Sequence, residues 1–139
     1  MKFSRQTAIV GIGATEFSKN SGRTPMQLAT ECSLKACEDA GIEPSLINGI
    51  SVFSAEKNTE IEVARNLGIP ELTFFSMIHH GGGAPGGVIQ QAAMAVDSGV
   101  ADYVLVYRAF NERSWHRFGT GVQGRHQSPE AFDVSFSWS

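Results

Sequence analysis

Five glycines within residues 81–87 separate an apolar run from an alanine-rich segment, a pattern that predicts a strand, a turn and then a helix. A turn almost without side chains lets a ligand's polar group approach the unpaired N–H groups at the start of a helix, where the helix dipole favours negative charge. The turn is therefore a candidate site for an oxyanion or a phosphate. The alternative is that the glycines only allow the helix to pack closely on the strand.

Length and charge limit the kind of protein. The chain has 139 residues, the size of one domain, and a net charge of −3. It contains no lysine run or basic face, so a nucleic-acid partner or an anionic membrane has little support and a small-molecule substrate is favoured. No apolar run has the length of a membrane span, and the N-terminus has no signal-peptide core. We therefore predict a cytoplasmic protein that does not bind membranes.

The cysteines and histidines do not form a metal-binding pattern. Cys32 and Cys37 lie five positions apart in one predicted helix, so their side chains point about 140° apart and cannot share a disulfide or a metal. His79 and His80 are adjacent, and the other two histidines are isolated in a polar segment, which is not the spacing of a zinc site. We predict no metal and no cofactor.

Apolar runs and helical spacing alternate along the first 110 residues. Strands are predicted at residues 7–13, 47–53, 72–78 and 103–107. Capping boxes predict helices that begin after Thr24 and Thr59, and Gly41 and Gly68 end them. The helix after the glycine turn carries few charges, so we expect it to be buried on several sides. This alternation predicts an α/β fold with a parallel βαβαβαβ core.

Gly11-Ile12-Gly13 resembles part of a dinucleotide-binding motif, but Glu16 stands where the third glycine belongs and a polar loop precedes the helix. We reject a Rossmann site.

The composition changes after Arg108. Arginines alternate with aromatic residues without a clear period, which is typical of a functional loop or cover, and a solvated face with extended arginines is the alternative. Residues 132–138 then alternate apolar and polar like a half-buried strand. We therefore predict an N-terminal α/β domain over residues 1–110 and the start of a loop or cover region over residues 111–139, in a natural chain that continues.

Several strings of the sequence, taken in order, resemble the N-terminal half of the thiolase superfamily. These are Gly-Ile-Gly-Ala-Thr at residues 11–15, Glu-Asp-Ala-Gly at 38–41, the glycine turn, and Ser-Gly-Val-Ala-Asp at 98–102. Further strings are similar to the lipid-transfer-protein-type thiolase homologues that act as aldolases in bacterial steroid side-chain degradation: Phe-Ser-Lys-Asn-Ser-Gly-Arg at 17–23, Asn-Thr-Glu-Ile at 58–61, Leu-Thr-Phe-Phe-Ser at 72–76, Ala-Ala-Met-Ala-Val at 92–96 and Tyr-Arg-Ala-Phe-Asn-Glu-Arg-Ser at 107–114. The resemblance implies a thiolase-like layered α/β fold, of which the C-terminal half is absent from this chain.

The resemblance also implies what chemistry to expect. Thiolases place a nucleophilic cysteine at the strand-to-helix turn, where the helix N-terminus lowers the thiol pKa. The corresponding position falls at about Gly82, and the turn contains no thiol. The resemblance therefore favours a non-covalent aldolase that cleaves a steroid side-chain β-hydroxyacyl-CoA to a 17-ketosteroid and propionyl-CoA. The alternative is a non-catalytic acyl-CoA or sterol binding and transfer subunit.

Site residues and partners follow from this resemblance. Gly81, Gly82 and Gly83 are expected to bind the thioester oxygen through their amides, and His79 or His80 could assist catalysis, although an ordinary packing or hydrogen-bonding role is the alternative for each. The main acid and base are expected beyond Ser139. Because arginine binds phosphates by bidentate hydrogen bonds, Arg113 and Arg117 are assigned to the CoA part of the substrate, with Arg108 and Arg125 as further candidates.

The expected assembly is a homodimer. It is bound to a small partner protein with an OB-fold and a zinc ribbon, often paired with an acyl-CoA hydratase.

Overall fold

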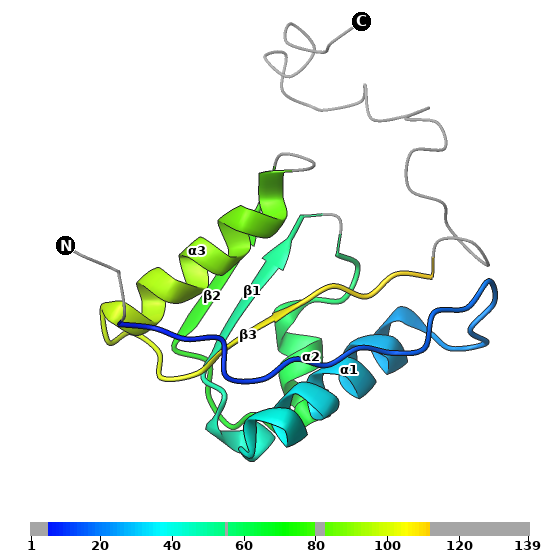
Figure 1. The fold of residues 1–139 in the computed structure, drawn as a ribbon, viewed down its shortest axis with the longest axis horizontal. Coiled ribbons are helices and arrows are strands. Elements are labelled where there is room, and N and C mark those ends of the chain that lie inside the picture. The colour runs from blue at the N-terminus through cyan, green and yellow to red at the C-terminus, as the bar shows by residue number, and fades with distance from the viewer. Residues whose placement is uncertain (1–5, 55, 80–82, 112–139) are drawn as a thin grey trace, which may run out of the picture.

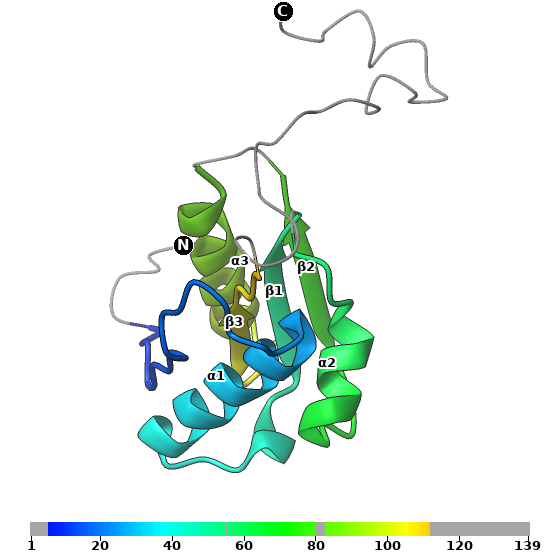
Figure 2. The ribbon, with the colours of Figure 1, turned by 90° about the vertical axis from the view of Figure 1, so that its right-hand side faces the viewer.

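A computed structural model describes residues 6–54, 56–79 and 83–111. Its centre is a three-stranded parallel sheet in the order β2-β1-β3, formed by β1 (Gly49–Phe53), β2 (Phe74–Ile78) and β3 (Val104–Tyr107). The helices are α1 (Pro25–Ala40), α2 (Glu60–Leu67) and α3 (Ala84–Asp97), with a short 3₁₀ helix η1 (Pro44–Leu46) before β1. Helices α1 and α2 cover one face of the sheet and α3 covers the other (Figures 1 and 2). The predicted α/β class is confirmed.

Local capping signals set the ends of α1 and α2. Thr24 and Thr59 each accept a hydrogen bond from the backbone N–H three residues later, and the Gln27 and Glu62 side chains accept from the cap N–H in return. Gly41 and Gly68 end these helices with φ of 67° and 72°, a left-handed conformation that favours glycine. Both predicted starts and both predicted stops are confirmed.

The core lies between the sheet and the pair α1 and α2. Ile50 and Val52 of β1 are essentially inaccessible to solvent and lie at its centre. Side chains from both helices and from β3 surround them: Leu28, Ala29, Val63, Ala64, Leu67, Leu105 and Tyr107. Removing this apolar surface from water is the main force that holds the helices on this face.

Helix α3 is buried on one side, not on several as expected. Its buried residues are Ala84, Val88, Ala92 and Ala95, which pack toward the sheet. Ile89 and Met94 are 48% and 40% exposed. The reason is that the sheet covers one stripe of the helix, and nothing among the described residues covers the opposite stripe.

The strand predicted at residues 7–13 is not part of the sheet. β1 pairs directly with β2 on one side and with β3 on the other, so both of its edges are occupied. Residues 7–13 instead form no strand, and the later part of this segment runs along α1 (Figure 1). The backbone N–H of Ile12 donates to Asp39 Oδ2 at 2.8 Å, and Lys35 Nζ donates to the carbonyl oxygen of Ala14 at 3.2 Å.

Gly11 and Gly13 allow this close approach to α1. A Cβ atom at either position would lie 2.2 Å from a carbonyl oxygen of the helix, that of Ala36 or that of Cys32. No side chain larger than hydrogen fits there. The two glycines that resembled part of a nucleotide-binding motif therefore serve backbone packing in this structure.

Candidate functional site

The carboxyl ends of the three strands meet at one edge of the sheet. Because the strands are parallel and Phe53 lies opposite Ile78, the segments that follow β1, β2 and β3 leave the sheet on the same side. In open α/β sheets this is the edge where ligands bind. Four features lie at this edge: the glycine turn, Arg108, Glu56 and Tyr107.

The glycine turn follows β2 at this edge. His79 is exposed directly after the strand, and Gly83 is the exposed N-cap residue of α3. No side-chain cap is found among the described residues, so the first N–H groups of α3 remain available as donors for a ligand. Gly87 lies close to Ile78, because a Cβ there would be 3.0 Å from Ile78 Cγ2. His80, Gly81 and Gly82 lie outside the described residues, and their assignment stays a prediction.

Arg108 follows β3 at the same edge. Its guanidinium carbon lies 5.4 Å from the centre of the Phe53 ring and 4.4 Å from that of Phe110, which are cation–π distances. Arg113 and Arg117, the arginines assigned to the substrate, lie outside the described residues, as does Arg125.

Glu56 is a buried carboxylate that the sequence analysis missed. It is 9% exposed and lies in the segment after β1. Its Oε1 accepts hydrogen bonds from Lys57 N at 3.0 Å and Asn58 Nδ2 at 2.9 Å, and its Oε2 accepts from Ala109 N at 2.8 Å. Glu56 therefore joins the segment after β1 to the segment after β3. The sequence signal that could have identified Glu56 is its position, three residues after the fully buried strand β1.

Tyr107 is a buried, protonated side chain next to this carboxylate. Its hydroxyl donates to the carbonyl oxygen of Asn58 at 3.2 Å. Burial, and after it the negative charge of Glu56, raises the pKa of Tyr107 far above its ordinary value. A buried phenol with a raised pKa that already donates to the backbone acts as a packing group.

Neither cysteine has the properties of a nucleophile. Both lie on α1, on the face of the sheet opposite α3. Burial raises the pKa of the Cys32 and Cys37 thiols, and the Cys32 thiol donates to the carbonyl oxygen of Ala29 at 3.2 Å. The thiolate is the reactive form of cysteine, so both groups are held in the unreactive form.

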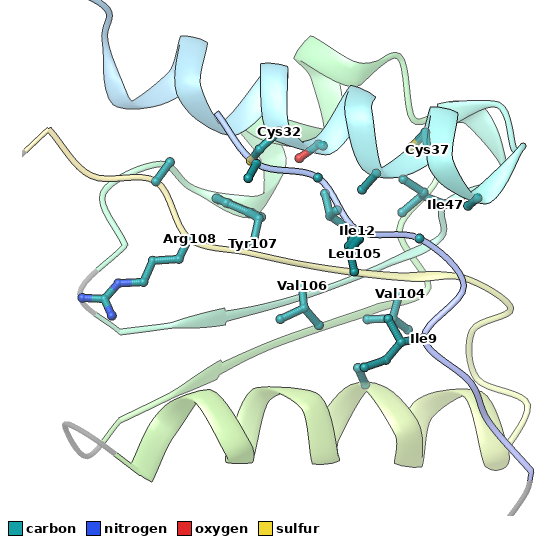
Figure 3. Close-up of a pocket in the computed structure, with 18 of the residues that line it drawn as sticks. Ile9, Ile12, Cys32, Cys37, Ile47, Val104, Leu105, Val106, Tyr107 and Arg108 are labelled. Atoms are coloured by element: carbon teal, nitrogen blue, oxygen red, sulfur yellow. The ribbon is translucent and has the colours of Figure 1, made fainter. Parts of the chain in front are cut away.

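An apolar cavity of about 890 Å³ lies on the β3 side of the molecule, within the size range of small-molecule sites (Figure 3). Residues 6–19, α1, α3 and the segment from β3 to Asn111 line it. Ile9, Ile12, Val104 and Leu105 contribute apolar wall, and Arg108 lies at one end (Figure 3).

No three metal-ligating side chains gather among the described residues. No helix of the described part combines the length and the apolar character needed to cross a membrane.

The chain is similar to an aldolase and a lyase from two bacteria. It is 56% identical over 131 residues to a steroid side-chain-cleaving aldolase of Thermomonospora curvata, and 56% identical over 138 residues to a 17-hydroxy-3-oxo-4-pregnene-20-carboxyl-CoA lyase of Mycobacterium tuberculosis. The solved structure of an Ltp2-ChsH2(DUF35) aldolase superposes on 93% of the chain with a TM-score of 0.76 and 55% identity. Over nearly its whole length, the chain is therefore similar to about a third of the length of these steroid side-chain-cleaving aldolases.

More distant structures share the fold of this chain. A monomeric SCP2-thiolase-like protein type 1 of Mycobacterium smegmatis is 24% identical with a TM-score of 0.59 over 75% of the chain. A priming β-ketosynthase of the R1128 polyketide pathway is 24% identical with a TM-score of 0.53 over 63% of the chain. The fold is therefore thiolase-like, as the resemblance implied. No family model matches the chain.

The chain spans about a third of the length of these relatives. The match covers 94% of this chain and 34% of the Thermomonospora protein, and for the mycobacterial protein it covers 97% of this chain and 36% of the relative.

Proposed function

We propose that the whole protein is an aldolase that cleaves a steroid side-chain β-hydroxyacyl-CoA by a retro-aldol reaction, giving a 17-ketosteroid and propionyl-CoA. The observation that carries this proposal is the 56% identity to two proteins whose names describe this activity. The state of the two cysteines supports it, because a covalent thiolase mechanism needs a thiolate and both thiols are held protonated.

The reaction requires proton transfers and a stabilised enolate. A base removes the proton of the β-hydroxyl, and the new carbonyl forms as the Cα–Cβ bond breaks. The electron pair of that bond moves to the thioester as an enolate, which takes a proton at Cα. Preorganised N–H donors around such an oxygen are worth about 3–4 kcal/mol each. In our proposal the glycine turn and the uncapped start of α3 supply these donors, and the main acid and base come from beyond Ser139.

Mass spectrometry of the full-length protein with the substrate tests this function. The protein is incubated with 17-hydroxy-3-oxo-4-pregnene-20-carboxyl-CoA, the thioester named for the mycobacterial relative. An aldolase releases a 17-ketosteroid and propionyl-CoA in equal amounts. Recovery of intact thioester from a folded, thioester-binding protein would instead identify a carrier subunit.

We also propose that the whole protein is a homodimer that binds a DUF35-type partner protein and works in the cytoplasm. The Ltp2-ChsH2(DUF35) aldolase is a complex with such a partner, which supports this proposal. The exposed apolar residues Ile89 and Met94 on α3, and Phe75 and Met77 on β2, provide surface for association. An OB-fold and zinc-ribbon partner, with an acyl-CoA hydratase, is the assembly to test by affinity purification, light scattering and cell fractionation.

A further inference from the structure

The guanidinium of Arg108 lies over two aromatic rings and has no anionic partner among the described residues. The rings of Phe53 and Phe110 lie on it at 5.4 Å and 4.4 Å. The ion pairs found in residues 6–54, 56–79 and 83–111 involve Arg23, Lys35 and Glu31, not Arg108. Arg108 is itself exposed. Aromatic rings contact the flat face of a guanidinium, so the N–H donors around its edge can still bind a ligand.

The backbone around Arg108 is held from both sides. Tyr107 before it is buried and donates to the carbonyl oxygen of Asn58, and Ala109 after it is buried and donates its N–H to Glu56 Oε2 at 2.8 Å. The Glu56 carboxylate is in turn held by the backbone N–H of Lys57 and the side chain of Asn58. Because the position of Arg108 is fixed before a ligand arrives, binding loses less conformational entropy there than at a free surface arginine.

The position suits one particular part of an acyl-CoA. β3 lies two strand spacings from β2, so the ends of these strands are about 10 Å apart along the sheet edge. The glycine turn follows β2, whereas Arg108 follows β3. In CoA the pantetheine arm separates the thioester from the phosphates, so a phosphate site must lie away from the group that receives the thioester oxygen. Guanidinium groups bind phosphates by paired, charge-assisted hydrogen bonds.

From this geometry we propose that Arg108 binds a phosphate group of the CoA part of the substrate, and that Glu56 is a positioning residue that holds Arg108 through the amide of Ala109. The proposal rests on the proposed function for the identity of the ligand. It assigns to Arg108 a role that the sequence analysis divided among four arginines.

Calorimetry with the full-length protein tests the site with two probes, propionyl-CoA and its phosphate-free counterpart S-propionylpantetheine. Arg108→Gln is expected to weaken propionyl-CoA binding by about 10-fold to 100-fold, the range for lost hydrogen bonds to a charged group, and to leave S-propionylpantetheine binding unchanged. Arg108→Lys, which keeps the charge but loses the paired geometry, is expected to lie in between. Arg65 is an exposed arginine on α2, so Arg65→Gln is the matched control and should bind both probes like the wild type.

A double-mutant cycle separates positioning from general structural damage. Glu56→Gln is expected to weaken propionyl-CoA binding only while Arg108 is present, so adding it to Arg108→Gln should cause no further loss. Equal weakening of both probes by Arg108→Gln, or none for propionyl-CoA, would overturn the proposal. If Arg108→Gln weakens propionyl-CoA binding but the full-length protein does not cleave the steroid thioester, the proposed function is wrong and the phosphate site stands. If the protein cleaves the thioester but Arg108→Gln leaves propionyl-CoA binding unchanged, the phosphate site is wrong and the proposed function stands.

Discussion

Asn48 and Asp102 form a reciprocal pair that links the start of β1 to the start of β3. Asn48 Oδ1 accepts from the backbone N–H of Asp102 at 2.9 Å, and Asn48 Nδ2 donates to Asp102 Oδ2 at 3.1 Å. The same Oδ1 also accepts from Tyr103 N at 3.2 Å. One side chain thus sets the point at which β3 enters the sheet, with Gly49 opposite Val104.

Replacing Asn48 should therefore destabilise the sheet. Asn48→Ala leaves the N–H groups of Asp102 and Tyr103 without their acceptor, and we expect the free energy of unfolding to fall by about 1–3 kcal/mol in urea denaturation of the full-length protein. Asn66→Ala is the control, because Asn66 is an exposed residue that donates within its own helix at 2.8 Å. Equal stability of the two variants would contradict the assigned role of Asn48.

The glycine turn can be tested with two glycines of the same segment. If the amides of the turn receive the thioester oxygen, Gly82→Val should lower kcat by about 100-fold to 1000-fold, because a β-branched side chain fills the approach path. At Gly86 a Cβ would meet no heavy atom within 4 Å, so Gly86→Ala should keep wild-type turnover and gain about 0.5–1 kcal/mol of helix stability. Normal turnover of folded Gly82→Val would remove the turn from the active site.

The cysteines should be dispensable for cleavage. Both thiols are held protonated by burial, so we expect slower alkylation by iodoacetamide at pH 8 than for a free cysteine. The double variant Cys32→Ala and Cys37→Ala should keep most of the wild-type kcat. Removing a nucleophile lowers kcat by a factor on the order of 10⁴ or more. A fall in kcat of that size in a folded variant would show that one of these cysteines takes part in covalent catalysis.

The cap of α2 should make stability depend on acid pH. Hydrogen bonds from the backbone N–H and then the hydroxyl of Thr59 lower the pKa of Glu62 below 4.5. Since the pKa is lower in the folded state, this stabilisation is present above about pH 4.5 and is lost as the pH falls through the lowered value.

Glu62→Gln is the variant that tests this, and α1 already has a glutamine, Gln27, at the equivalent position. The difference in unfolding free energy between wild type and variant should shrink from pH 6 to pH 3 in urea titrations. A difference that is the same at both pH values would show that the charge of Glu62 plays no part.

The features that the sequence predicted best are those set by neighbouring residues. Thr24, Gly41, Thr59 and Gly68 act on their own helix ends, so their signals are complete within a few positions. The apolar run at residues 7–13 predicted a buried strand, and this was wrong, because Ile9, Val10 and Ile12 are 74%, 58% and 75% exposed. The segment is held instead by backbone hydrogen bonds to Asp39 and Lys35 of α1, more than 20 positions along the chain.

The candidate site divides in the same way. The place of His79 and Gly83 at the sheet edge followed from the strand, turn and helix pattern around them. Glu56 was missed because one of its partners, Ala109, lies 53 positions away. The stacking of Arg108 on Phe53 was invisible for the same reason, since only the pairing of β1 with β3 brings these residues together.

The central place of β1 also bears on how the protein folds as it leaves the ribosome. Both strands that pair with β1 come later in the chain, and the second ladder is completed only at Tyr107. Until then one edge of β1 has open hydrogen-bonding groups beside the apolar side chains Ile50 and Val52. Nascent chains that end before Tyr107 therefore expose a segment that favours aggregation, and chaperones should bind them from the synthesis of β1 until that of β3.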